Sequence, residues 1–137
     1  MGTIANNGQT ALHFTASKAN LELAKTLLSN GASARVKDKR GQLPLHRAAA
    51  VGSVPMLKLL LAAKSPLNAT DIDGMTALHH AVSEGHGDAV LFLLTNGAEF
   101  DKKDNEGRLP LDLVPDAKVR YPSFTIPRQA RQTANEI

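Results

Sequence analysis

The strongest constraint on this chain is an internal repeat of 33 residues. Leu-His or Leu-Asp pairs stand four residues after each of a series of evenly spaced glycines, Gly8, Gly41, Gly74 and Gly107. Self-similarity at such a period is the signature of small units that stack on their neighbours. The 137 residues therefore predict an array over residues 1–120, with units at 5–37, 38–70, 71–103 and an incomplete 104–120.

Each unit begins with a turn and continues into a short helix. Asp-x-x-Gly stretches favour a turn because Asp bonds nearby backbone and Gly accepts a positive φ. Thr10 and Thr76 are suited to cap the helix that follows, whereas Pro44 and Pro110 suit its first position. Small residues within this helix favour close stacking of one unit on the next.

A second helix is predicted in each unit from apolar residues at helical spacing. Gly31 and Gly97 are placed to close this helix with a glycine cap. Lys64 occupies the corresponding corner of the second complete unit, so we expect a weaker cap there. No unit can bury its apolar face alone, and the fold class that follows is an all-α stack.

Composition removes several classes of function. The chain has no Cys, which excludes disulfides, thiol nucleophiles and thiolate zinc sites. Its longest apolar run, residues 59–63, is too short to cross a membrane. A formal charge of +3 is too small to argue for nucleic-acid binding by itself.

The repeat resembles the ankyrin repeat. Residues 74–81 (GMTALHHA) and 96–98 (NGA) are similar to its signature. The resemblance implies an L-shaped solenoid of helix-turn-helix units, with β-turn fingers projecting beside a concave helical surface. It also implies a non-catalytic module that binds proteins.

A narrower resemblance is carried by residues 37–50 and 64–81, which are similar to the ankyrin-repeat chaperones of the proteasome regulatory particle. It implies binding to the C-terminal domain of a proteasomal AAA ATPase subunit, in the cytoplasm and nucleus. Those chaperones have about seven repeats, so the chain resembles a shortened form. A generic ankyrin adaptor for another regulatory protein is the alternative.

The two ends of the array are expected to differ from its centre. The first unit has Ala5 where Asp is expected and reads as an internal repeat. We therefore expect apolar surface around Leu12, Leu23 and Leu27, and a tendency to associate. Residues 116–120 begin like a helix that Pro122 interrupts, and residues 121–137 are predicted to be a disordered tail.

No residue pattern supports catalysis. His13, His46 and His79 are one repeat apart, which suggests the same structural role in each unit: a bond to backbone near the helix start. Their separation is too great for one metal ion. There is no phosphate loop, dinucleotide fingerprint or nucleophile elbow. We expect no enzyme activity, cofactor, metal or small-molecule substrate.

The phase of the repeat predicts which side chains line the concave surface. These residues are expected to bind the partner: Lys18, Lys37, Lys39, Arg40, Arg47, Asp73, Met75, Glu84, Lys103, Glu106 and Arg108. The first two units supply cations and the third supplies acids, with Ile72 and Met75 as an apolar centre. Such a pattern favours a folded protein over nucleic acid, which acids would repel.

Overall fold

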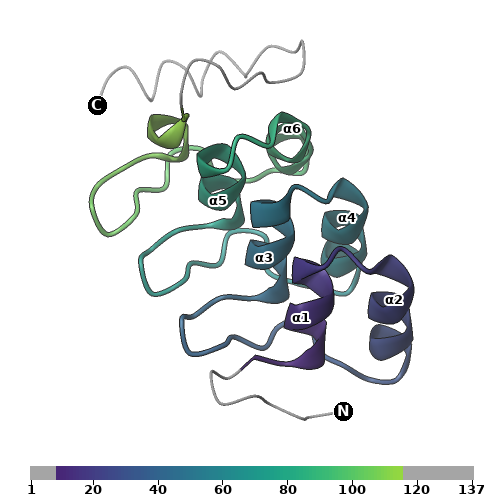
Figure 1. Ribbon diagram of the computed structural model, residues 1–137. Coiled ribbons are helices and arrows are strands. Elements are labelled where there is room, and N and C mark those ends of the chain that lie inside the picture. Colours follow the sequence, from purple (N-terminus) through teal and green to yellow (C-terminus); the bar gives the residue numbers. More distant parts are fainter. Residues whose placement is uncertain (1–8, 116–137) are drawn as a thin grey trace.

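The computed structural model describes residues 9–115, which fold into a stack of helix pairs (Figure 1). The first pair is α1 (Ala11–Ser17) and α2 (Leu21–Ser29), and the second is α3 (Pro44–Val51) and α4 (Val54–Ala62). The third pair is α5 (Ala77–Ser83) and α6 (Gly87–Thr95), followed by the 3-10 turn η1 (Pro110–Leu113). The predicted order of turn, short helix and second helix is confirmed.

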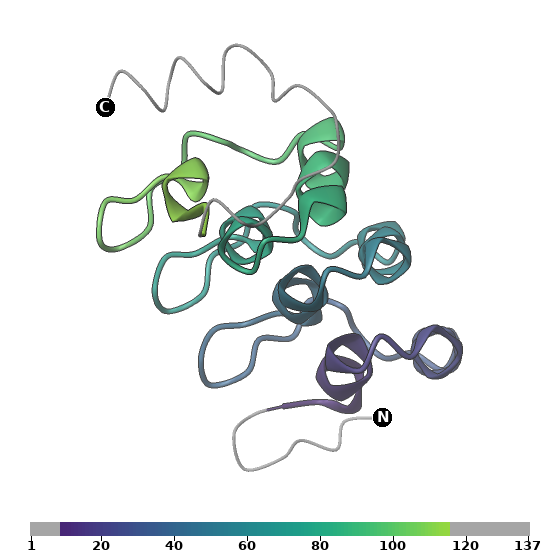
Figure 2. The same cartoon turned by 45° about the horizontal axis from the view of Figure 1, so that its top comes forward.

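The helices form two layers. α1, α3 and α5 stack side by side in one layer and α2, α4 and α6 in the other, with long loops projecting beyond the first layer (Figures 1 and 2). The interior between the layers contains leucines and many alanines, which allow the close stacking expected from their size. None of the helices in residues 9–115 combines the length and apolar character needed to span a bilayer.

Local sequence explains where the first-layer helices begin. Thr10 and Thr76 cap α1 and α5 through side chains that accept from the backbone N–H three residues later. α3 lacks such a hydroxyl and instead begins at Pro44, whose missing N–H would be unpaired in any case. Both predicted kinds of helix start are therefore present.

The corner after α4 keeps its hydrogen bonds despite lacking glycine. The backbone N–H groups of Lys64 and Ser65 donate to the carbonyls of Leu61 and Leu60, as in the glycine-containing corners of the other units. Lys64 reaches this geometry with φ +72°, in the left-handed region that favours glycine. The weaker cap expected there consists of backbone strain rather than lost hydrogen bonds.

The expected exposure of the first unit is partly wrong. Leu23 is 42% exposed and Leu27 is half-buried, but Leu12 is buried, with 1% of its surface exposed. Leu12 belongs to the buried hydrophobic core, whereas Leu23 does not. The predictions for residues 116–120 and for the tail 121–137 lie outside the described residues.

Candidate functional site

Three finger turns, residues 38–42, 71–75 and 104–108, are each organised by the carboxylate that begins them. One oxygen of Asp38 accepts from the backbone N–H groups of Arg40 and Gln42, both at 2.9 Å. Asp71 and Asp104 make the same two contacts in their own turns. Because these bonds fix the loop from inside, the side chains between them are held outward.

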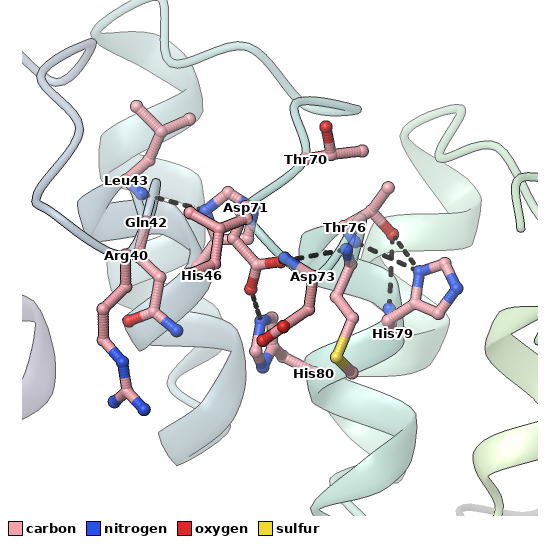
Figure 3. Close-up of polar contacts among 12 residues, drawn as sticks. Arg40, Gln42, Leu43, His46, Thr70, Asp71, Asp73, Thr76, His79 and His80 are labelled. Carbon is pink, nitrogen blue, oxygen red and sulfur yellow. Dashed lines mark hydrogen bonds and ion pairs between the residues drawn. The ribbon is translucent and has the colours of Figure 1, made fainter. Parts of the chain in front are cut away.

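The second carboxylate oxygen of each finger aspartate binds a cationic or basic side chain. Asp38 pairs with Arg47 on α3 at 2.7 Å, and Asp71 pairs with His80 on α5 at 2.8 Å (Figure 3). Asp104 pairs with Arg108 of its own turn at 2.9 Å. In the first two fingers this contact joins the finger turn to the helix that follows it.

These contacts lower the pKa of the finger aspartates. Burial opposes ionisation of Asp38, but the guanidinium of Arg47 and the two turn N–H groups outweigh it, so its pKa lies below the usual value. The pKa of Asp71 is lowered against the same opposition, chiefly by the hydrogen bond from His80. The finger carboxylates therefore stay ionised at neutral pH and hold the turns.

Successive fingers are joined by backbone hydrogen bonds. The N–H of Ile72 donates to the carbonyl of Arg40 at 3.0 Å, and the N–H of Asn105 donates to the carbonyl of Asp73 at 2.9 Å. Gly74 permits this approach, because a Cβ there would lie 2.8 Å from the backbone nitrogen of Asn105. The three fingers consequently form one connected edge.

A second series of bonds links each first-layer helix to a loop further along the chain. In each case a backbone N–H at the helix start donates to histidine Nδ1, which leaves the proton on Nε2. Nε2 then donates to a backbone carbonyl further along the chain, at 2.7, 2.9 and 3.1 Å in the pairs His13–Gln42, His46–Ala69 and His79–Arg108. Gln42 and Arg108 belong to the next unit, whereas Ala69 lies at the end of the unit that contains His46. The predicted structural role of these histidines is confirmed, and for His13 and His79 it extends across the unit boundary.

These bonds leave the histidines no free nitrogen for a ligand. Burial and the neighbouring His80 lower the pKa of His46 to about 4, and burial lowers the pKa of His13 and His79. Within residues 9–115, no group of three or more His, Asp or Glu side chains is placed to hold a metal ion. The arrangement supports binding through surface side chains rather than chemistry at a buried centre.

The predicted binding residues differ in how freely they project. The exposed members are Lys18, Lys37, Lys39, Arg40, Asp73, Glu84, Lys103 and Glu106. The half-buried members are Arg47, Met75 and Arg108. Each finger turn carries two of the predicted residues: Lys39 and Arg40 on the first, Asp73 and Met75 on the second, and Glu106 and Arg108 on the third.

Three of the predicted cations already have partners within the chain. Arg47 binds Asp38 and also donates to the hydroxyl of Ser17 at 3.3 Å. The ammonium of Lys37 donates to the carbonyl of Thr70 at 3.0 Å. Arg108 pairs with Asp104 and Glu106. Among the predicted cations of units one and two, those without a contact of this kind are Lys18, Lys39 and Arg40, of which Lys18 lies over the ring of Phe14.

The contact between Asp71 and His80 was not expected from the sequence. A signal for it exists in the repeat, since Asp38 and Arg47 stand nine residues apart and so do Asp71 and His80. In the first unit the equivalent residues are Ala5 and Phe14, so both members of the pair are absent together. Comparing aligned positions in pairs would have found this link.

Comparison with known proteins agrees with this architecture. A family model described as ankyrin repeats, in three copies, matches residues 12–104. A search of curated proteins gave no match. The matched region covers all six α-helices except the first residue of α1, together with the first two finger turns. The chain therefore belongs to the ankyrin-repeat family, whose repeats are protein–protein interaction modules.

Proposed function

We propose that the chain binds a folded protein through the finger turns and the adjoining ends of the first-layer helices. One observation carries the proposal: the fingers are joined by the Ile72–Arg40 and Asn105–Asp73 backbone bonds while their tips project into solvent. A partner meeting such an edge need not order it first. Pre-organisation of this kind lowers the entropic cost of binding.

The free side chains indicate the chemistry of the partner. Lys39 and Arg40 form a basic tip on the first finger turn, and Asp73 places an acid on the second. Ile72 lies between them and is 60% exposed. The partner is expected to present acids to the basic tip, an apolar side chain to Ile72 and a basic group to Asp73.

The specific partner that we propose is the C-terminal domain of a proteasomal AAA ATPase subunit. Support comes from the similarity of residues 37–50 and 64–81 to gankyrin, the ankyrin-repeat chaperone of the proteasome regulatory particle. The chain would then act in regulatory-particle assembly, in the cytoplasm and nucleus. The charge order along the fingers is compatible with a partner surface that carries both signs.

Calorimetry with the purified C-terminal domains of the proteasomal ATPase subunits tests this proposal. We expect one domain to bind, and the double variant Lys39→Glu, Arg40→Glu to weaken that binding at least tenfold. The matched control is Lys25→Glu, Lys58→Glu, which makes the same charge change on exposed positions of α2 and α4 and should bind as the parent chain does.

The possible results test the identity of the partner and the location of the binding surface separately. If no ATPase domain binds, the proposed partner is wrong, and the chain would be an adaptor for another protein. If a domain binds and the control variant weakens binding as much as the finger variant, the proposed surface is wrong. Binding that falls steeply with salt to duplex DNA instead would favour nucleic acid.

A further inference from the structure

The C-terminal ends of the first-layer helices carry three equivalent side chains of different chemistry. Lys18 follows α1, Val51 ends α3 and Glu84 follows α5, each one repeat after the last. All three are exposed, Val51 to 43% of its surface. Along the stack the order is therefore a cation, an apolar side chain and an acid. We call Lys18, Val51 and Glu84 the helix-end row.

The helix-end row lies on the side of the helices that contacts the finger turns. Arg47 binds the finger aspartate Asp38, and Val51 stands four residues after Arg47 in α3. His80 binds the aspartate of the second finger turn, and Glu84, four residues later, donates its N–H to the carbonyl of His80. Residues four apart lie on one face of a helix. The row and the finger turns therefore form one surface, on the side of the first layer that faces away from the second (Figure 2).

The tips of the finger turns show the same change of charge along the stack. Arg40 on the first finger turn and Asp73 on the second are one repeat apart, and both are exposed. Beside them, Lys39 is replaced one repeat later by Ile72. Two neighbouring rows, one at the helix ends and one at the finger tips, thus change from cation to acid in the same direction.

These charges are available to a partner. Within residues 9–115, neither Arg40 nor Asp73 forms an ion pair, and the same holds for Lys18 and Glu84. By contrast, Glu106 on the third finger turn pairs with an arginine of its own turn at 3.5 Å. The unpaired charges of the two rows are therefore cations over units one and two and acids over unit three.

We propose that this surface binds one helix of the partner, which lies along the stack with its N-terminal turn over unit one and its C-terminal turn over unit three. The helix dipole favours acids in the first turn of a helix and cations in the last. A helix with that charge order places acids beside Lys18 and Arg40, and cations beside Asp73 and Glu84. The inference rests on the proposed function, from which it takes the side of the molecule that the partner contacts.

The dimensions of the stack suit such a helix. Packed helices lie about 8–10 Å apart, so the two steps from unit one to unit three cover roughly 16–20 Å. A helix rises about 1.5 Å per residue, so about 12 residues span this distance. An apolar side chain near the middle of the helix would meet Val51, between the charged ends of the row. An extended segment has no comparable preference for acids at one end, because the dipoles of its peptide groups alternate.

Fluorescence anisotropy with three designed peptides tests the proposal on the full chain. The first peptide has Glu at its N-terminal end, a central Leu and Lys at its C-terminal end. The second has the same composition with Glu and Lys interleaved, and the third is the first with a central Ala replaced by Pro, which breaks a helix. We expect the first to bind at least tenfold more tightly than the others. If the first bound no more tightly than the second, the charge order would be wrong, and if the third bound equally well, the helix would be wrong.

Exchanging the charges of the helix-end row tests the surface. Lys18→Glu with Glu84→Lys keeps the net charge but reverses the order, and should weaken binding of the first peptide at least fivefold. The matched control is Lys58→Glu with Asp88→Lys, which makes the same exchange at exposed positions of α4 and α6. Circular dichroism establishes that both variants keep their helix content. Unchanged binding by the first variant, or an equal loss in both, would overturn the proposed surface.

A nitroxide label at the N-terminus of the first peptide tests the direction of the bound helix. It should broaden the amide NMR signal of Lys18 more than that of Glu84, and the opposite order would overturn the direction. The peptides require no ATPase subunit, so this inference and the proposed partner can fail separately. If an ATPase domain binds while the first two peptides bind alike, only the helix inference is wrong.

Discussion

Each of the histidines His13, His46 and His79 accepts at one ring nitrogen and donates at the other, so its hydrogen bonds require the neutral ring. Protonation would give Nδ1 a hydrogen facing the backbone N–H that it now accepts. For His46, burial and the nearby His80 add to this cost, and its pKa falls to about 4. Folding and protonation of these rings therefore oppose each other.

The first prediction is a loss of stability between pH 6.5 and pH 4. The unfolded chain takes up a proton on His46 near pH 6.5, whereas the folded chain does so only near pH 4. The free energy of unfolding should thus fall as pH drops through this interval, by about 3 kcal/mol from His46. The lowered pKa values of His13 and His79 act in the same direction.

Urea unfolding at half-unit pH steps measures this effect. The finger aspartates, whose pKa values lie below the usual 3.8, contribute stability that is lost only at more acid pH. A free energy of unfolding that stayed constant from pH 6.5 to pH 4.5 would contradict the histidine explanation.

The second prediction concerns Lys64, whose φ is +72°. Replacing it with glycine should stabilise the chain by roughly 0.5–1 kcal/mol, because an L side chain is strained in this conformation. Lys58→Gly, inside α4, is the control and should destabilise by about 1 kcal/mol. Thermal or urea unfolding compares the two variants, and a loss of stability in Lys64→Gly would contradict the strain.

At the scale of the element, a finger turn is held by its own aspartate and by the finger beside it. Gly74 and Gly107 occupy equivalent positions with φ of +76° and +78°. A Cβ on Gly74 would lie 2.5 Å from the side-chain oxygen of Asn105, whereas a Cβ on Gly107 would meet nothing within 4 Å. Comparing substitutions at Gly74 and Gly107 therefore distinguishes the cost of a positive φ from the cost of a clash with the neighbouring finger.

The third prediction uses this difference. Gly107→Ala should cost about 1 kcal/mol of stability from its positive φ alone. Gly74→Ala should cost that amount and roughly 1–3 kcal/mol more, because it also forces the two fingers apart. Urea unfolding of both variants measures the difference, and equal losses would mean that the contact with Asn105 adds no constraint.

Local elements were predictable because their causes are local. Thr10 and Thr76 specify helix starts, and the turn is specified by an Asp and a Gly three residues apart. The bond between Ile72 and Arg40 was not predictable, because it depends on how closely one unit stacks on the next. The ion pair of Asp38 with Arg47 lies within one unit; the prediction missed it because each position was considered singly and not together with the position nine residues away.

At the scale of the molecule, stability is distributed along the stack and depends on neighbours. The second helix pair has a neighbour on each side, whereas the first exposes Leu23. The fourth prediction is that amide hydrogens of α2 exchange faster with solvent than those of α4, as measured by hydrogen exchange. Slower exchange in α2 would contradict this dependence of stability on neighbouring helix pairs.

The histidine links all run in one direction along the chain. Each ring donates to a carbonyl further towards the C-terminus, which for His13 and His79 lies in the following unit and for His46 lies at the end of its own unit. Asp112 occupies the same position in the fourth unit, where its carboxylate accepts from the N–H of Leu109 at 2.8 Å. An ionised carboxylate has no proton to pass forward. Asp112 therefore accepts the hydrogen bond at the helix start, as the histidines do, but cannot donate one to a carbonyl further along the chain. Asp112→His would supply that donor in an engineered array with a further unit.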